Sequence, residues 1–341
     1  MATAKKILIT GASGFIGQAL CEALAKRGDF VIAVTRSPER QKSSIPCASK
    51  VISWDQISGE KEIHAVIHLA GESVAQRWTQ KSKERILNSR VKGLQQLRQA
   101  LNREPGFSPA VLISASGIGY YGNRADDWLS EDSPPGTDFL ASTCIAWERE
   151  ALAIQASRQI IFRIGMVLGK DGGALAKMLP PFRLGLGGRL GKGNQWISWI
   201  QLDDLVSLFL FAIDQSSLSG TFNAVSPNPV TNEQFTKNLA KVLNRPAPFP
   251  VPSIALKMAL GEMAEMLLGG QRGSAKKLEQ AGFHFDEYNE PTARKTEKFA
   301  ELIIEECVKQ CSQEWYDLNN ISTEDLDDRG IAIRVGQKAG V

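Results

Sequence analysis

The first 170 residues of the 341-residue chain alternate short apolar runs with segments of helical spacing. The apolar runs lack a regular apolar/polar alternation, so they are predicted strands that are buried on both faces. They cover Lys6–Thr10, Phe30–Val34, 51–54, 65–70, 110–115 and 160–164. Between the first two, apolar residues recur at helical spacing from Phe15 to Leu24. This rhythm predicts right-handed crossovers and a doubly wound α/β fold with a parallel sheet.

The sequence pattern changes after residue 169. A glycine-rich stretch extends to Gly193, and such a stretch is typical of a loop that lines a site. A helix is predicted to follow Asp203 and Asp204, because aspartate caps helices and is favoured at the positive end of the helix dipole. Helical spacing returns within 249–285 after two prolines.

The chain is therefore predicted to have three parts. Residues 1–170 form the sheet domain, which later strands up to about 225 can join. Residues 171–290 form a smaller C-terminal lobe on the substrate side. Residues 291–341 form an atypical tail with a short helix at 299–307 and partial disorder. The segment 294–341 has seven Lys and Arg against ten Asp and Glu, a net charge of −3, so the rest of the chain carries +6.

Composition and charge narrow the function classes. Hydrophobic residues make up 43% and charged residues 23%, which excludes wholesale disorder. Forty Lys and Arg against 37 Asp and Glu leave +3, too balanced for a protein that binds nucleic acid through its phosphates. No apolar run predicts a membrane span, and the chain enters its first strand without a signal peptide. The five cysteines are too scattered for a disulfide framework, so we expect a reducing, cytoplasmic setting.

A glycine motif directly after the first strand is the sharpest signal of function. It reads TGASGFIG over residues 10–17 and opens the first amphipathic helix. Gly11 permits the tight turn, Gly14 lets backbone N–H groups approach a pyrophosphate, and Gly17 allows close packing of the helix. The motif predicts a Rossmann-like dinucleotide-binding domain. The predicted pyrophosphate contacts are Gly11, Ser13, Gly14, Phe15 and Ile16, and Gly17 is counted with this cofactor-binding motif.

The end of the second strand selects the cofactor. NAD-specific sites usually offer an acid there for the ribose 2′-hydroxyl, whereas an arginine accommodates a 2′-phosphate. This chain has Arg36 followed by Ser37, and no acid precedes them. The pattern favours NADP(H), with an ordinary solvated arginine as the alternative.

Further motifs resemble the extended short-chain dehydrogenase/reductase superfamily. The three-residue spacing of Gly11, Gly14 and Gly17 fits it, as do HLAGE at 68–72 and SASGIGYYG at 114–122. Closer still, six motifs resemble an atypical subgroup of epimerase-family proteins, some of which carry the label of cell-division inhibitor homologues. These motifs are RW at 77–78, SRVKG at 89–93, LPPF at 179–182, SWI at 198–200, NPVT at 228–231 and GEMAE at 261–265.

The resemblance covers roughly residues 5–286 and implies further site residues. Leu69, Ala70, Gly71 and Glu72 are expected on the adenosine side and ribose of the cofactor, although Glu72 could instead cap a helix. Members of the superfamily usually move the substrate proton with a Tyr-x-x-x-Lys pair on the fifth helix. No such pair exists in this chain.

Alignment of the fifth helix shows which residues replace the catalytic pair. Leu140 falls at the tyrosine position and Cys144 at the lysine position. In nucleotide-sugar epimerases an arginine usually holds the diphosphate, and here Ile197 stands in its place, which lowers the expectation of such a substrate. Trp196 and Trp199 suggest a more apolar ligand, or else a packing role.

Ser116 and Tyr121 are the remaining candidates for catalysis. Both are expected to contact a substrate carbonyl, with a purely structural role for Ser116 left open. Cys144 is expected to be a buried, inert thiol. The pair Cys307 and Cys311 stands alone, so no metal site is predicted.

Two functions stay open on these grounds. The first is an NADP(H)-dependent oxidoreductase or epimerase-like enzyme that acts on an unidentified small molecule. The alternative is a non-catalytic NADPH-binding module that regulates or senses through a protein partner, for example in cell division. A homodimer is compatible with either function, and neither a nucleic acid nor a membrane is expected as a partner.

Overall fold

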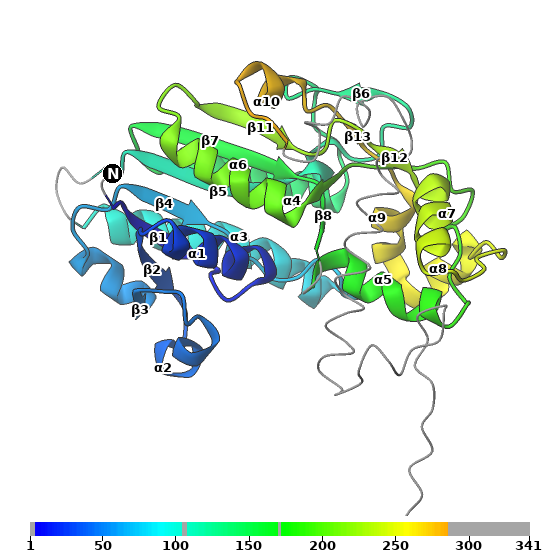
Figure 1. The fold of residues 1–341 in the computed structure, drawn as a ribbon, viewed down its shortest axis with the longest axis horizontal. Helices are drawn as coiled ribbons and strands as arrows, with labels where there is room; N and C mark the ends of the chain where they lie inside the picture. The colour runs from blue at the N-terminus through cyan, green and yellow to red at the C-terminus, as the bar shows by residue number, and fades with distance from the viewer. Residues whose placement is uncertain (1–3, 104–107, 170–171, 286–341) are drawn as a thin grey trace, which may run out of the picture.

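A seven-stranded sheet forms the centre of the molecule (Figure 1) in the computed structural model, which describes residues 4–103, 108–169 and 172–285. The strand order is β11-β7-β5-β4-β1-β2-β3, and all neighbours are parallel. The order reverses at β1, so the predicted doubly wound α/β fold is confirmed. The strands are β1 Lys6–Thr10, β2 Phe30–Val34, β3 Lys50–Ile52, β4 Ala65–His68, β5 Val111–Gly117, β7 Arg158–Ile164 and β11 Gly220–Ala224.

Helices cover both faces of this sheet. α1 packs against α6, and α3 packs against α4. The aliphatic side chains of β1, β2, β4 and β5 are buried between these helix pairs and make up the core. The helices over the sheet are α1 Phe15–Lys26, α3 Gln80–Leu101, α4 Phe139–Leu152 and α6 Leu202–Asp214. The short helices beside it are α2 Pro38–Gln41, η1 Lys42–Ser44, η2 Trp54–Gly59 and η3 Ile118–Tyr121.

Several element ends differ from the prediction for local reasons. β3 ends at Ile52 because Ser53 and Gln56 form a reciprocal capping box that starts η2. α6 begins one residue before the aspartates, with Gln201 at its N-cap. Asp203 and Asp204 therefore lie in its first turn, where the helix dipole favours negative charge.

Most of a set of short elements lie at one end of the sheet (Figure 1), whereas α10 (Lys276–Gln280) lies against β11. The helical spacing predicted within 249–285 is realised in short pieces, and α8 ends where Gly261, the first residue of η4, has a φ of +62°. These elements are α5 Gly173–Arg183, α7 Asn232–Val242, α8 Ser253–Leu260, η4 Gly261–Met263, α9 Ala264–Leu268 and α10 Lys276–Gln280. The short strands are β6 Trp128–Leu129, β8 Met166–Leu168, β9 Trp196–Ile197, β10 Trp199–Gln201, β12 Val230–Thr231 and β13 Arg272–Gly273.

The proposed boundaries at 170 and 290 stay predictions. β11 lies well beyond residue 170 and still belongs to the central sheet. The tail 291–341, with the helix expected at 299–307, lies outside the described residues.

Candidate functional site

The glycine motif forms a tight loop between β1 and α1. Gly11 has a φ of +78°, and a Cβ placed on it would lie 2.7 Å from the backbone nitrogen of Ala70. A Cβ on Gly17 would lie 2.2 Å from the carbonyl oxygen of Gly11. Both positions therefore exclude any larger side chain, since real Cβ contacts are never so short. The loop after β1 and the loop after β4 thus touch through their backbones.

The N-terminus of α1 has the features of an anion site. Its N-cap is Gly14, no side chain caps it, and its first turn contains no acid. Ser13 and Gly14 are exposed. On the other side, the ring of Phe15 packs against Gly172 and Gly173. Free N–H groups and the helix dipole together attract a phosphate at this place.

Arg36 and Ser37 follow β2 at the same edge of the sheet. The register pairs Thr10 with Val34, so the glycine loop and Arg36 leave neighbouring strands side by side. The side chain of Arg36 is exposed and forms no ion pair with any of the described residues. Ser37 is the N-cap of α2, although its hydroxyl makes no capping hydrogen bond there. Both side chains thus lie at the end of β2 next to the glycine loop, and their contact with a 2′-phosphate stays a prediction.

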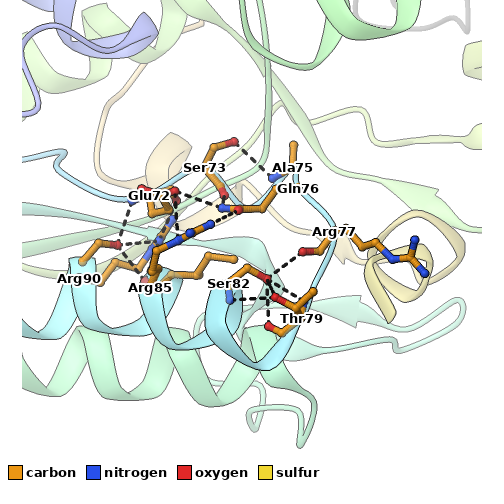
Figure 2. Close-up of polar contacts among 11 residues, drawn as sticks. Glu72, Ser73, Ala75, Gln76, Arg77, Thr79, Ser82, Arg85 and Arg90 are labelled. Carbon is orange, nitrogen blue, oxygen red and sulfur yellow. Dashed lines mark hydrogen bonds and ion pairs between the residues drawn. The ribbon is translucent and has the colours of Figure 1, made fainter. Parts of the chain in front are cut away.

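Leu69, Ala70, Gly71 and Glu72 leave β4 on the other side of the glycine loop. Leu69 donates its backbone N–H to the carbonyl oxygen of Thr10 at 3.0 Å. The carboxylate of Glu72 accepts a hydrogen bond from Gln76 at 3.4 Å and lies 3.9 Å from the guanidinium of Arg85 (Figure 2). Glu72 therefore caps no helix, and its carboxylate is half-buried at the end of β4.

Ser116, the last residue but one of β5, belongs to a buried polar network. Its hydroxyl donates to Glu148 of α4 at 2.7 Å. The same carboxylate accepts two hydrogen bonds from Arg163 of β7, each of 2.9 Å. All three side chains are buried. Since a paired carboxylate only accepts hydrogen bonds, the proton of Ser116 is committed to Glu148.

Tyr121 is joined to this network from inside the core. Its hydroxyl donates to Asn223 at 2.7 Å and accepts from Arg163 at 2.9 Å, and the side chain is fully buried. Burial raises the pKa of Tyr121 to about 12. The structure thus connects the two predicted catalytic residues, Ser116 and Tyr121, through Arg163 and Glu148. It leaves no exposed part of Tyr121 for a substrate.

Leu140 and Cys144 stand opposite the end of β5. Leu140 packs against Gly119, and the thiol of Cys144 lies 3.7 Å from the carbonyl oxygen of Gly117. Burial, and then the charge of Glu148, raise the pKa of Cys144 to about 11. A thiol of this kind is a poor nucleophile. Neither Leu140 nor Cys144 can therefore carry out the proton transfer that a Tyr–Lys pair performs.

Sequence reasoning missed Glu148, Arg163 and Asn223 as members of the site. The sequence pattern gave no sign of Glu148, because an acid on an amphipathic helix is usually solvated. Arg163 sits in an otherwise apolar strand, IIFRI, and a charge buried there needs a partner. That conflict was the available signal.

Neither a metal cluster nor a membrane helix is present in the part of the chain that the structure describes. No group of three or more His, Cys, Asp or Glu side chains is arranged to hold a metal ion there. No helix among the described residues is long and apolar enough to cross a membrane.

Comparison with known proteins decides the family. The model of the NAD dependent epimerase/dehydratase family matches residues 7–224. The chain belongs to this family. A domain of unknown function, DUF1731, follows at residues 251–289 of this epimerase-family chain. The resemblance to the epimerase-family subgroup is thereby confirmed.

Relatives of this epimerase-family protein cover most of its length. The chloroplastic SDR39U1 homolog of Arabidopsis thaliana is 39% identical over 82% of both chains. An epimerase family protein of Mycobacterium bovis is 41% identical over 82% of this chain and 93% of its own. The crystal structure of human SDR39U1 with NADPH has 30% sequence identity to this chain. The two structures match with a TM-score of 0.77, over 89% of this chain and 99% of that one. The Rossmann-like fold is confirmed by this match.

Proposed function

We propose that this chain is an NADP(H)-dependent enzyme of the epimerase family that acts on a small molecule. The observation that carries the proposal is that two features lie side by side at one edge of the sheet. The uncapped N-terminus of α1 follows β1, and the exposed Arg36 follows the neighbouring strand β2. One supplies N–H groups for a pyrophosphate and the other a cation for the 2′-phosphate. The NADPH in the human SDR39U1 structure supports the same cofactor. NADP(H) is the cofactor of this chain.

The hydrogen-bond network around Ser116 favours one kind of functional group in the substrate. Because Ser116 gives its proton to Glu148, only its lone pairs are open toward a ligand. A substrate hydroxyl group, which donates, suits these lone pairs better than a carbonyl, which only accepts. Ser116 thus orients an alcohol beside the nicotinamide, and Tyr121 supports it through Arg163.

A non-catalytic NADPH-binding module is the second candidate. Leu140 and Cys144 at the positions of the usual Tyr–Lys pair favour it, as does the burial of Tyr121. Such a module would act through a protein partner or a homodimer. The cytoplasm is the proposed compartment in either case, although the Arabidopsis relative carries a chloroplastic label.

A thermal-shift experiment tests the cofactor site. NADPH should raise the melting temperature more than NADH at equal concentration, because ligand stabilisation follows concentration relative to the dissociation constant. Arg36→Glu should abolish this preference, whereas Arg40→Glu, at an exposed arginine four residues further on, should preserve it. Equal shifts by both cofactors in the unmodified protein would contradict the proposal.

A turnover experiment separates enzyme from module. The protein is incubated with NADP⁺ and a panel of alcohols, and with NADPH and the matching carbonyl compounds, while the nicotinamide absorbance is followed. Turnover that Ser116→Ala removes supports the enzyme. Tight NADPH binding without any turnover supports the module.

A further inference from the structure

Two neighbouring residues of α3 hold the peptide groups of Glu72 from both sides. The backbone N–H of Glu72 donates to the hydroxyl of Ser89 at 2.9 Å. The guanidinium of Arg90 donates to the carbonyl oxygen of Glu72 at 3.0 Å, and Figure 2 shows the Arg90 side chain beside Glu72. Since Glu72 follows directly on Gly71, both bonds act on the loop that leaves β4.

The guanidinium of Arg90 is itself tightly held. It donates a second hydrogen bond to the carbonyl oxygen of Ile86 at 3.0 Å. One face lies over the ring of Trp147 at 4.8 Å, and a Cβ built on Gly71 would lie 3.1 Å from its central carbon. Burial lowers the pKa of Arg90. A cation packed in this way keeps one orientation, so it can fix the loop above it.

The loop that Arg90 holds continues to the glycine motif. Gly11 is so close to Leu69 and Ala70 that a Cβ would lie 2.7 Å from the backbone of each. The peptide of Leu69 is also bonded to Thr10. A shift of the Glu72 peptide would therefore reach the pyrophosphate loop through backbone contacts alone.

We propose that Ser89 and Arg90 are positioning residues for the dinucleotide: they clamp the peptide of Glu72 and so hold the 69–72 loop against the glycine loop. This inference rests on the proposed function, because the loop matters only if the cofactor lies along it. Neither residue touches the cofactor in this proposal. Their effect passes through the backbone of Glu72.

Arg85 on the same helix provides a matched control. It is exposed, donates to the side chain of Gln76 at 2.9 Å, and lies near the carboxylate of Glu72 (Figure 2). It makes no bond to the Glu72 backbone. Arg85→Gln thus removes a guanidinium beside Glu72 and leaves the clamp intact.

The test compares the full-length protein with Arg90→Gln, Ser89→Ala, Ser89→Thr and Arg85→Gln. Titration with NADPH should show an affinity loss of about tenfold for Arg90→Gln, the effect of one lost hydrogen bond from a charged donor. Ser89→Ala should lose less, and Ser89→Thr, which keeps the hydroxyl, should recover the affinity. Arg85→Gln should bind as the unmodified protein does. Equal NADPH affinity in all five proteins would overturn the proposal.

Hydrogen exchange supplies the second readout. The amide of Glu72 should exchange faster in Ser89→Ala than in the unmodified protein, and Ser89→Thr should restore its protection, while amides of the central sheet stay unchanged. This measurement decides for the clamp even if Arg90→Gln fails to fold. If the unmodified protein binds no NADPH, the proposed function fails, and the exchange rates still test the clamp. Unchanged exchange at Glu72 in Ser89→Ala would overturn the clamp itself.

Discussion

Replacing Arg163 by methionine should destabilise the protein more than most single substitutions. Arg163 makes two hydrogen bonds of 2.9 Å to Glu148 and one of 2.9 Å to Tyr121. Its guanidinium also lies 3.4 Å from the centre of the Tyr120 ring. In the variant, the carboxylate of Glu148 stays buried among the same neighbours without a cation.

The magnitude follows from the buried charge that is left behind. Removing one partner of a buried ion pair costs about 3–5 kcal/mol, whereas replacing both partners by apolar residues is often close to neutral. Arg163→Met should therefore lose about 3–5 kcal/mol of unfolding free energy. The double variant Arg163→Met/Glu148→Met should lose about 1–2 kcal/mol, since Ser116 then lacks its acceptor.

Urea denaturation followed by tryptophan fluorescence measures these differences. Lys237→Met serves as control, because its ion pair with Glu233 is exposed and exposed pairs contribute little. A loss below about 1 kcal/mol, or a double variant no more stable than the single one, would refute the reasoning.

Three further predictions concern separate parts of the molecule. Burial and the charge of Arg90 lower the pKa of His68 to about 3. Between about pH 6.5 and 3 the unfolded chain therefore binds a proton on His68 that the folded chain does not bind, so the free energy of unfolding decreases as the pH is lowered. At pH 5 the decrease from this group is about 2 kcal/mol. His68→Leu should remove this part of the pH dependence in urea titrations. At pH 8, iodoacetamide should modify Cys47 before Cys144, as peptide mass spectrometry would show, because Cys144 is buried with a pKa of about 11. A chain that ends at residue 290 should bind NADPH with unchanged affinity and lose less than about 2 kcal/mol, since the whole central sheet and the glycine loop precede it; insoluble protein would contradict this.

Local sequence patterns were sufficient for the fold and for the glycine loop between β1 and α1. β1 and β2 have the predicted bounds, because an apolar run between turn residues can hardly form anything but a buried strand. Gly11 needs its left-handed backbone, and Gly17 needs the absence of a side chain. Both requirements arise within eight consecutive residues, so the sequence states them directly.

The polar network and the clamp depended on tertiary structure. Tyr121 and Asn223 are 102 residues apart, and Ser116 and Glu148 are 32 apart. No periodicity links such pairs, because they meet only when the sheet brings β5, β7 and β11 together and α4 packs across them. The same packing buries Tyr121. Its motif suggested contact with a substrate, but the structure makes it an enclosed hydrogen-bond partner of core residues. The sequence by itself determined which backbone could receive a dinucleotide. Only the packing of distant segments decided which side chains lost their water and therefore had to pair with one another.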